Sequence, residues 1–335
     1  MNFGTIVEYN NSVEQLHGIY RLFKTVTGKV VVYKGLSSFN AVDKFSNGQD
    51  IDPHINRFNR PNVLRVFWYT PQKYWGAFAW DLPSLEDLIR FHDYVGSRGF
   101  YVENVCITDD NSSLLNDIKS LINGLKTSGL SNILFEAVNE PYVKEKLEPS
   151  VLRSTLDSTP YLYSSGINPQ DFPDKYFGQY VTPHLPRDDE GVRKFKDLEE
   201  ISSEYKIPSV SDEWAKPTDG NFSELDFYTH AAGSCLMGNG GTYHFESGKL
   251  ITTPTDKEIR YGNAWFAGLN LYPSDACLGA YRHRQDLEEI VDGVPTAALR
   301  VFEKGSYAII VRNKSVKIPS NWVPLDSYNV GFRIE

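Results

Sequence analysis

The chain has 335 residues, of which 41% are hydrophobic and 23% charged, and its 34 basic and 43 acidic residues give a formal net charge of −9. This composition excludes a disordered chain, a collagen-like chain and a disulfide-rich scaffold. The Lys and Arg residues are scattered through an acidic chain, so we expect no nucleic-acid partner. No apolar run approaches the roughly 20 residues that cross a bilayer, so we expect no membrane partner either.

The spacing of cysteines and histidines predicts no metal site. Cys106, Cys235 and Cys277 form no Cys-x-x-Cys pair, and the seven histidines include no His-Glu-x-x-His motif. We therefore expect neither a disulfide framework nor a bound cofactor. The first residues lack a basic start followed by an apolar stretch, which predicts no signal peptide. The compartment, cytoplasmic or exported with the signal already removed, stays open, as does the oligomeric state.

Short β-branched or aromatic runs alternate with longer amphipathic stretches, which predicts repeated strand–helix units. Such units, recurring at intervals of roughly thirty residues, are typical of a closed (β/α)8 barrel, the TIM barrel of the α/β class. The eight predicted strands are 30–33, 63–68, 100–107, 133–138, 161–163, 180–184, 209–212 and 242–245.

Helices are predicted where apolar residues recur at helical spacing. One of them begins after the capping residue Ser84 and runs through Val95. From Ala298 onward the pattern changes to short strands with turns, which predicts a small antiparallel β appendage. The other predicted helices are 111–125, 193–205, 224–237 and 256–269.

The length fits one barrel of about 250 residues with added β structure better than two average domains. We expect an N-terminal hairpin or cap at 1–27, the barrel at 28–272 and a small C-terminal β region at 273–335. The N-terminal part is expected either to cover the floor of the barrel or to join the C-terminal sheet.

Two of the predicted strands end in acidic residues. Strand 133–138 runs into Asn139-Glu140-Pro141, and strand 209–212 runs into Glu213-Trp214. Because barrel enzymes carry their catalytic groups at the C-terminal ends of the strands, we expect Glu140 and Glu213 to face one site.

Together with Asn62-Val63-Leu64-Arg65-Val66 on the second strand, these motifs resemble the clan of retaining (β/α)8-barrel glycoside hydrolases that includes many cellulases and mannanases. The opening segment 34–39 also resembles the first strand and loop of that clan, and the resemblance spans about residues 28–270. It implies a glycoside hydrolase that cleaves β-glycosidic bonds in an oligo- or polysaccharide, with a carbohydrate substrate as its partner and without a cofactor.

The resemblance also implies roles for individual residues. Glu140 would be the acid/base and Glu213 the nucleophile, Asn139 would bind the sugar 2-hydroxyl, and Arg65 would lie beneath the nucleophile and keep it ionised. A cation lowers the pKa of a neighbouring carboxylate, whereas a second carboxylate raises it, which separates the two roles. The alternative for Arg65 is a structural ion pair inside the barrel.

Neighbouring polar residues leave alternatives open. His184 and His244 stand where the clan often has a His-x-Tyr element and a tryptophan, so each is expected either to contact the sugar or to be a buried structural residue. Glu136 lies deeper than Glu140 and is expected in a structural pair. Asp212 points away from the site if its strand is regular, although a one-residue slip would exchange it with Glu213.

Aromatic residues make up 13% of the chain, and several follow the predicted strand ends. Sugar sites are lined by aromatic faces with polar groups between them, so we expect a substrate platform here, with a packed lid as the alternative. Trp265 and Trp322 are expected in the core. The rival functions are a non-catalytic glycan-binding or structural barrel, and a transglycosidase that uses the same residues. The expected platform residues are Trp68, Trp75, Trp80 and Trp214.

Overall fold

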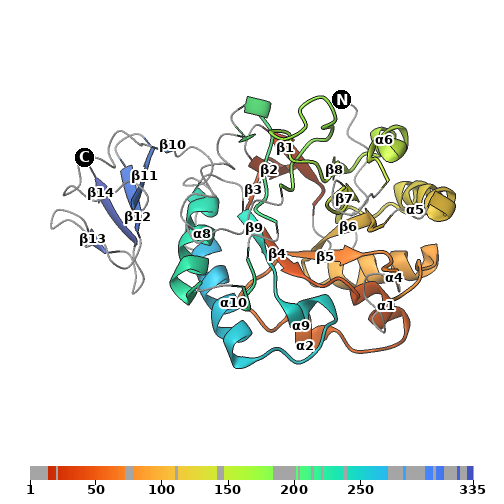
Figure 1. The fold of residues 1–335 in the computed structure, drawn as a ribbon, viewed down its shortest axis with the longest axis horizontal. Helices are drawn as coiled ribbons and strands as arrows, with labels where there is room; N and C mark the ends of the chain where they lie inside the picture. Colours follow the sequence, from red (N-terminus) through yellow and green to blue (C-terminus); the bar gives the residue numbers. More distant parts are fainter. Residues whose placement is uncertain are drawn as a thin grey trace.

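Short strands, several of them rich in Val, Leu, Ile and Phe, form a parallel sheet at the centre of the molecule, which is known from a computed structural model (Figure 1). Six of these strands pair side by side in the order β8-β7-β6-β5-β4-β9. They are β4 (Tyr33–Ser37), β5 (Val63–Phe67), β6 (Tyr101–Ile107), β7 (Ile133–Val138), β8 (Leu162–Ser164) and β9 (Gly240–Tyr243). The structure describes residues 14–19, 22–71, 79–109, 112–141, 147–183, 201–202, 204–212, 215–219, 222–236, 240–270, 282–283, 299–304, 307–312, 323–324 and 330–334.

Isolated bridges continue the sheet between its two outer strands, β8 and β9. Val181 pairs in parallel with Ser209, and Ser211 pairs in parallel with Gly241 at the start of β9. The segment that contains Val181 meets β8 where Ser164 bridges to Gly178. The sheet therefore curls into an α/β barrel, as predicted, although two of its eight expected strands pair only through single bridges.

The first barrel strand begins later than predicted. Val30–Val31 forms β3 and pairs with a neighbouring hairpin, whereas the barrel strand β4 begins at Tyr33. The predicted strand 30–33 is therefore divided between two sheets. Residues 30 and 31 belong to β3, Tyr33 belongs to β4, and Val32 connects the two strands. Within β4, Gly35 lets β9 approach closely, since a Cβ at this position would lie 2.5 Å from the Oγ1 atom of Thr242.

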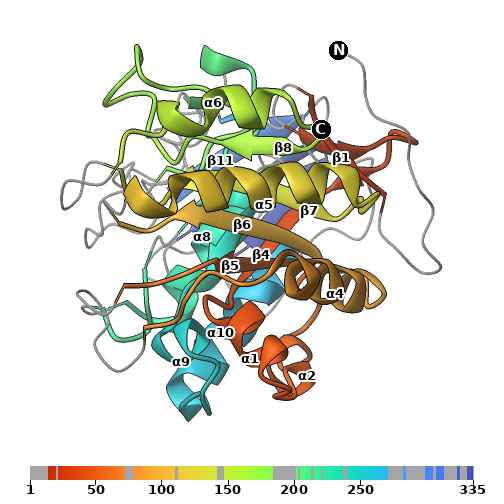
Figure 2. The same cartoon turned by 90° about the vertical axis from the view of Figure 1, so that its right-hand side faces the viewer.

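Amphipathic helices cover the outside of the barrel. Figure 2 shows α4 (Leu85–Gly96), α5 (Leu115–Thr127) and α6 (Ser150–Asp157) lying one above another across strands β5 to β8. As predicted, α4 is capped by Ser84, whose hydroxyl accepts a hydrogen bond from the amide of Asp87. The remaining helices are α1 (Ala41–Ser46), α2 (Asp52–Ile55), α8 (Glu224–Leu236), α9 (Glu246–Lys249), α10 (Asp256–Leu269) and the 3-10 helix η2 (Ser112–Leu114). Most of the predicted helix 193–205 lies outside the described residues.

A small antiparallel sheet near the N-terminus covers the floor of the barrel. It consists of β1 (Leu16–Ile19), β2 (Leu22–Thr25) and β3. Phe23 on β2 is fully buried and packs against side chains from the first residues of the barrel strands. The described residues of this segment therefore pack against the floor of the barrel. The floor cluster contains Leu16, Phe23, Tyr33, Val63, Tyr101, Leu134, Leu162, Tyr180 and Val210.

The C-terminal part forms a second antiparallel sheet with the order β10-β11-β12-β14-β13, which Figure 1 shows beside α8. Its existence agrees with the predicted β appendage, whereas the boundaries at 27/28 and 272/273 stay predictions. The strands are β10 (Arg282–His283), β11 (Leu299–Lys304), β12 (Tyr307–Arg312), β13 (Val323–Pro324) and β14 (Val330–Ile334).

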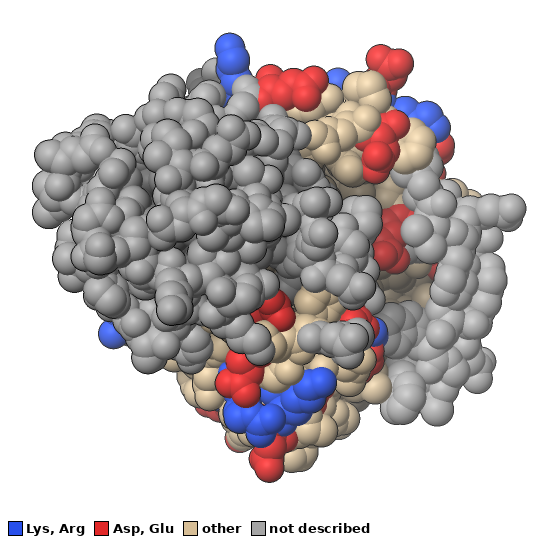
Figure 3. Space-filling model, turned by 60° about the vertical axis from the view of Figure 1, so that its left-hand side comes forward, with Lys and Arg blue, Asp and Glu red and all other residues tan. Residues whose placement is uncertain are grey.

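Two surface properties complete the description. In the described part of the chain, no helix is both long enough and apolar enough to span a bilayer. On the face shown in Figure 3, the acidic and basic side chains of the described residues lie interspersed.

Candidate active site

The interior of the barrel is built in layers. Side chains alternate across a strand, so residues two apart point to the same side. Two residues beyond members of the apolar floor cluster, four strand segments each place a charged side chain inside the barrel, and all four side chains are buried. These side chains form what we call the polar layer: Arg65 on β5, Glu103 on β6, Glu136 on β7 and Asp212.

Arg65 is the centre of the polar layer. Its Nη2 atom lies 3.0 Å from both carboxylate oxygens of Glu136. Its Nε atom lies 2.9 Å from Oδ2 of Asp212 and 3.4 Å from Oε2 of Glu103. The guanidinium group lies over the ring of Phe67, with 5.0 Å between its Cζ atom and the ring centroid. One buried cation therefore holds three buried carboxyl groups together.

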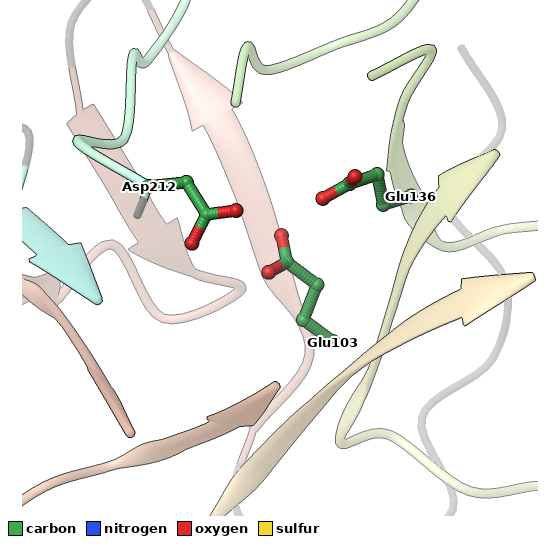
Figure 4. Close-up of side chains that lie close together, drawn as sticks. All are labelled: Glu103, Glu136 and Asp212. Carbon is green, nitrogen blue, oxygen red and sulfur yellow. The ribbon is translucent and has the colours of Figure 1, made fainter. Parts of the chain in front are cut away.

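The three carboxyl groups point toward one another in Figure 4, and one oxygen atom from each lies within 4.8 Å of the others. Such a set of oxygens has the spacing of a cation site, but the Arg65 guanidinium already contacts all three groups and supplies positive charge there. We therefore assign no metal to the cluster. Burial, together with the charges of Glu136 and Asp212, raises the pKa of Glu103 to about 8.

Arg65 also reaches the carboxyl end of β7, where the predicted acid/base lies. Its Nη2 atom donates to the side-chain oxygen Oδ1 of Asn139 at 3.0 Å. The backbone N–H of Asn139 donates to the carbonyl of Ile107 at 2.9 Å. Glu140 follows directly, is half-buried and has a φ of +46°. A residue other than glycine in this left-handed region stores strain, and such strain clusters at functional sites. The strand end therefore holds Asn139 rigidly and presents Glu140 next to it.

A regular strand with Glu213 facing the site would point the side chain of Asp212 away from it, and the structure differs from that arrangement. Asp212 lies inside the barrel beside Arg65, because it shares strand parity with Val210 in the floor cluster. Of the two orientations left open for Asp212, away from the site or exchanged with Glu213 by a one-residue slip, the structure has Asp212 pointing inward. Glu213 and Trp214 lie outside the described residues, as do Trp75 and His184.

Trp68 has a different place from the one expected for a sugar platform. It is fully buried, its Nε1 atom donates to Oδ1 of Asn104 at 2.9 Å, and its ring meets Phe135 edge to face. Its parity along the strand is opposite to that of Arg65 and Phe67, so it packs outside the barrel in the main core. Trp68 is thus a packing residue in this structure.

Trp80 and Tyr69 lie at a cavity of about 870 Å³ beside the carboxyl ends of β5 and β6. Trp80 donates from Nε1 to the carbonyl of Phe67, and Tyr69 donates its hydroxyl hydrogen bond to Asp109 at 2.7 Å. Asp117 and Ser120 of α5 complete the polar part of the wall. The cavity therefore combines aromatic rings with hydrogen-bonding groups, as sugar sites do.

His244 is buried inside the barrel, above the polar layer. Its Nδ1 atom lies 2.9 Å from the Ser37 hydroxyl, and its ring stacks on Phe39 at 5.5 Å between centroids. Phe39 in turn stacks on Phe67, which covers Arg65. Of the two roles expected for His244, these contacts favour the structural one. As expected, Trp265 is buried in the core, whereas Trp322 lies outside the described residues.

Sequence reasoning missed one member of the cluster, Glu103. It lies in the middle of β6, far from any recognisable motif. Glu103 could have been noticed as an acidic residue within a strand whose other members are almost all apolar. A charged side chain in such a buried strand needs a partner. The partner, Arg65, comes from the neighbouring strand β5.

Comparison with known proteins identifies the fold but no family. No family model and no curated protein matches the chain. A glycoside hydrolase family 5 structure from Bacteroides vulgatus has a TM-score of 0.57 at 12% identity, covering 91% of this chain and 82% of that chain. A putative glycoside hydrolase from the same organism has a TM-score of 0.54 at 13% identity, covering 93% and 72%. A β-glucanase from Saccharophagus degradans, in complex with cellotetraose, has a TM-score of 0.52 at 12% identity, covering 81% and 98%. The chain therefore has the α/β-barrel fold of these glycoside hydrolases.

Proposed function

We propose that the protein is a retaining glycoside hydrolase that cleaves β-glycosidic bonds in an oligo- or polysaccharide. The observation that carries the proposal is the end of β7, where Asn139 accepts a hydrogen bond from buried Arg65 and Glu140 follows in a strained, half-buried position. Glu140 lies at the C-terminal end of a barrel strand, where enzymes of this fold carry their catalytic groups. Its strained backbone conformation is a further feature of functional sites.

In the proposed reaction, a carboxylate oxygen of Glu213 attacks the anomeric carbon while the bond to the leaving oxygen breaks. The electron pair of that bond goes to the leaving oxygen, which takes the proton of Glu140. Glu140 then removes a proton from water, and the water oxygen replaces Glu213 on the anomeric carbon. Asn139 is proposed to bind the sugar 2-hydroxyl, where hydrogen bonds strengthen in the transition state.

Asp212 is the second candidate for the nucleophile, because its carboxylate lies 2.9 Å from Arg65. We favour Glu213, the next residue in the chain, because Asp212 is only 1% exposed and is held by the guanidinium. A nucleophile must reach the substrate, whereas a buried ion pair stabilises the barrel beneath it. This choice gives the two adjacent carboxylates different roles.

A carbohydrate substrate is proposed to contact the cavity walled by Tyr69, Trp80 and Asp109, with Trp75, Trp214 and His184 as further proposed contacts. Aromatic faces stack on sugar C–H surfaces, and carboxylates accept hydrogen bonds from sugar hydroxyls. The β-glucanase with the same fold was solved with cellotetraose, so β-linked glucans are the first substrates to test.

The deciding experiment uses variants at the two adjacent acidic positions and an aryl β-glycoside substrate. We expect Glu213→Gly to lose turnover, by about two orders of magnitude or more, and azide to restore it with formation of a glycosyl azide. Asp212→Gly is the matched variant: a folded Asp212→Gly protein that azide rescues, with Glu213→Gly fully active, would move the nucleophile to Asp212.

Glu140→Gln tests the acid/base. We expect it to slow natural substrates by roughly 10²–10⁴-fold, and to slow substrates with an acidic leaving group much less. Full activity of Glu140→Gln, Glu213→Gly and Asp212→Gly would contradict the proposed catalytic residues. For the wild type, oligosaccharide binding without any turnover would identify the glycan-binding barrel, and transfer to an added sugar acceptor would identify the transglycosidase.

A further inference from the structure

Glu103 lies inside the barrel, and described groups from several strand segments face it. Tyr33 of β4 approaches its Oε2 atom at 2.7 Å, and Arg65 of β5 approaches the same atom at 3.4 Å. Tyr180 approaches its Oε1 atom at 2.7 Å. Glu136 and Asp212 complete the surroundings as the two other carboxyl groups of the polar layer.

The hydroxyl of Tyr180 allows the protons to be counted. Its oxygen lies 2.7 Å from Oε1 of Glu103 and 2.9 Å from the carbonyl oxygen of Phe135. A tyrosine hydroxyl carries one hydrogen, and a carbonyl oxygen can only accept. This single hydrogen can serve Oε1 of an ionised Glu103 or the carbonyl of Phe135. When it serves Phe135, the contact with Oε1 is also a hydrogen bond provided that Glu103 carries a proton there and donates it to the tyrosine oxygen.

The other oxygen of Glu103 is consistent with this arrangement. Oε2 receives the hydroxyl of Tyr33 at 2.7 Å and the more distant Nε atom of Arg65 at 3.4 Å. In a neutral carboxyl group one oxygen carries the proton, and the other remains an acceptor. Oε2 of Glu103 thus faces donors, whereas Oε1 faces a hydroxyl that can donate or accept, so the geometry accommodates a neutral carboxyl group.

Arg65 lies closer to some of its partners than to others. Its short contacts, at 2.9–3.0 Å, go to Asp212, Glu136 and Asn139. Its contact with Glu103 is the longest of the four, at 3.4 Å. Among the described residues, Arg65 is the cation that contacts all three carboxyl groups, and bringing three negative charges together in a buried site is costly. A proton on Glu103 leaves two carboxylates for one cation.

We propose that Glu103 is a neutral carboxylic acid in the folded protein and acts as a positioning residue, which leaves the Arg65 guanidinium to Glu136, Asp212 and Asn139. If Glu103 lost its proton, it would compete for Arg65 and weaken the hydrogen bond that holds Asn139 beside Glu140. The protonation state stands without the proposed function, whereas the positioning role rests on it.

The protonation state can be measured directly by carbon-13 NMR of protein labelled at the glutamate carboxyl carbons. At pH 6.5 we expect one glutamate signal at the position of a neutral acid, absent in Glu103→Gln, and moving to the ionised position as the pH passes about 8, the pKa that burial gives this group. Only ionised glutamates at pH 6.5, or a neutral signal that persists in Glu103→Gln, would overturn the proposal.

Glu136→Gln is the matched control, because it removes a negative neighbour without touching Glu103. The neutral signal should persist in this variant and should ionise at lower pH, since the charge of Glu136 contributes to the raised pKa of Glu103. An unchanged transition in a folded Glu136→Gln protein would contradict the proposal, because the charge of Glu136 would then have no effect on the neutral acid.

The positioning role has its own readout. Gln has a carbonyl for Tyr33 and an amide donor for Tyr180, so it imitates the neutral acid, whereas Ala does neither. We expect Glu103→Ala to lower kcat on an aryl β-glycoside by tenfold or more and Glu103→Gln to recover most of that loss. A Glu103→Gln protein as impaired as Glu103→Ala would overturn the positioning role. No turnover by the wild type would instead contradict the proposed function and leave the NMR result intact.

Discussion

The floor of the barrel and the polar layer above it come from the same strands, two residues apart, and both are buried. The floor holds together by packing around Phe23, so each of its members can change with a local cost. The polar layer depends on one cation, Arg65, which contacts three carboxyl groups and Asn139. The difference teaches that equal burial does not mean equal sensitivity, because a buried charge is stable only with its partners.

The largest effect is expected when the cation of the polar layer is removed. Arg65→Met keeps much of the side-chain volume but leaves Glu103, Glu136 and Asp212 without their shared partner. We expect the free energy of unfolding to fall by about 3–5 kcal/mol. Urea denaturation at pH 7 measures it, and a loss below about 1 kcal/mol would remove the contrast between the layers.

A cavity in the floor is expected to cost somewhat less. Leu134 lies two residues before Glu136 on β7 and is 1% exposed. We expect Leu134→Ala to cost about 2–5 kcal/mol, depending on how far the floor relaxes. The same denaturation series at pH 6 and pH 8 sharpens the comparison, because the cost of Leu134→Ala should be the same at both, whereas that of Arg65→Met should change with pH.

A smaller effect is expected from the hydroxyl that joins the two layers. Tyr180 belongs to the floor cluster, yet its hydroxyl reaches Glu103 and the carbonyl of Phe135. Tyr180→Phe keeps the ring and leaves both groups without this partner, for which we expect a cost of about 1–3 kcal/mol. A neutral effect in thermal and urea denaturation would show that neither hydrogen bond stabilises the fold.

The pH dependence of stability is the finest test, at most about 1.4 kcal/mol per pH unit. The pKa of Glu103 is raised by burial from 4.5 to about 8, so between these values the folded protein binds a proton that the unfolded chain does not. Stability from this group is therefore complete below about pH 4.5 and is lost as the pH rises to about 8. Glu103→Gln should abolish the decline between pH 6.5 and pH 8.

Two buried histidines act in the opposite direction at lower pH. Burial lowers the pKa of His54 and of His92 from 6.5 to about 4, so between these values the unfolded chain binds more protons. Their contribution is complete above about pH 6.5 and is lost as the pH falls to about 4. Together with Glu103 they predict a stability maximum near pH 6.5. A wild-type curve that still rises from pH 6.5 to pH 8 would contradict the neutral Glu103.

Much of the fold follows from local patterns. The helix α10 has the predicted bounds 256–269, and its capping residue Thr255 forms a capping box with Glu258. The strand β7 has the predicted bounds 133–138 and leads directly into Asn139 and Glu140. Local patterns predict such elements because caps and side-chain alternation act between neighbours in the chain. Glu140 and Glu213 as a catalytic pair remain predictions.

The contacts between strands required the tertiary structure. Alternation along a strand shows that residues 210 and 212 share one face, but not that this face lies inside the barrel, where Asp212 meets Arg65. The same uncertainty put Trp68 on a sugar platform, although its face packs in the core. The sequence alone determined which residues line up along each strand. Strand pairing decided which strands meet and in which register, so Glu103 lies beside Arg65 as its partner on β6 although 38 positions (103 − 65) separate them in the chain.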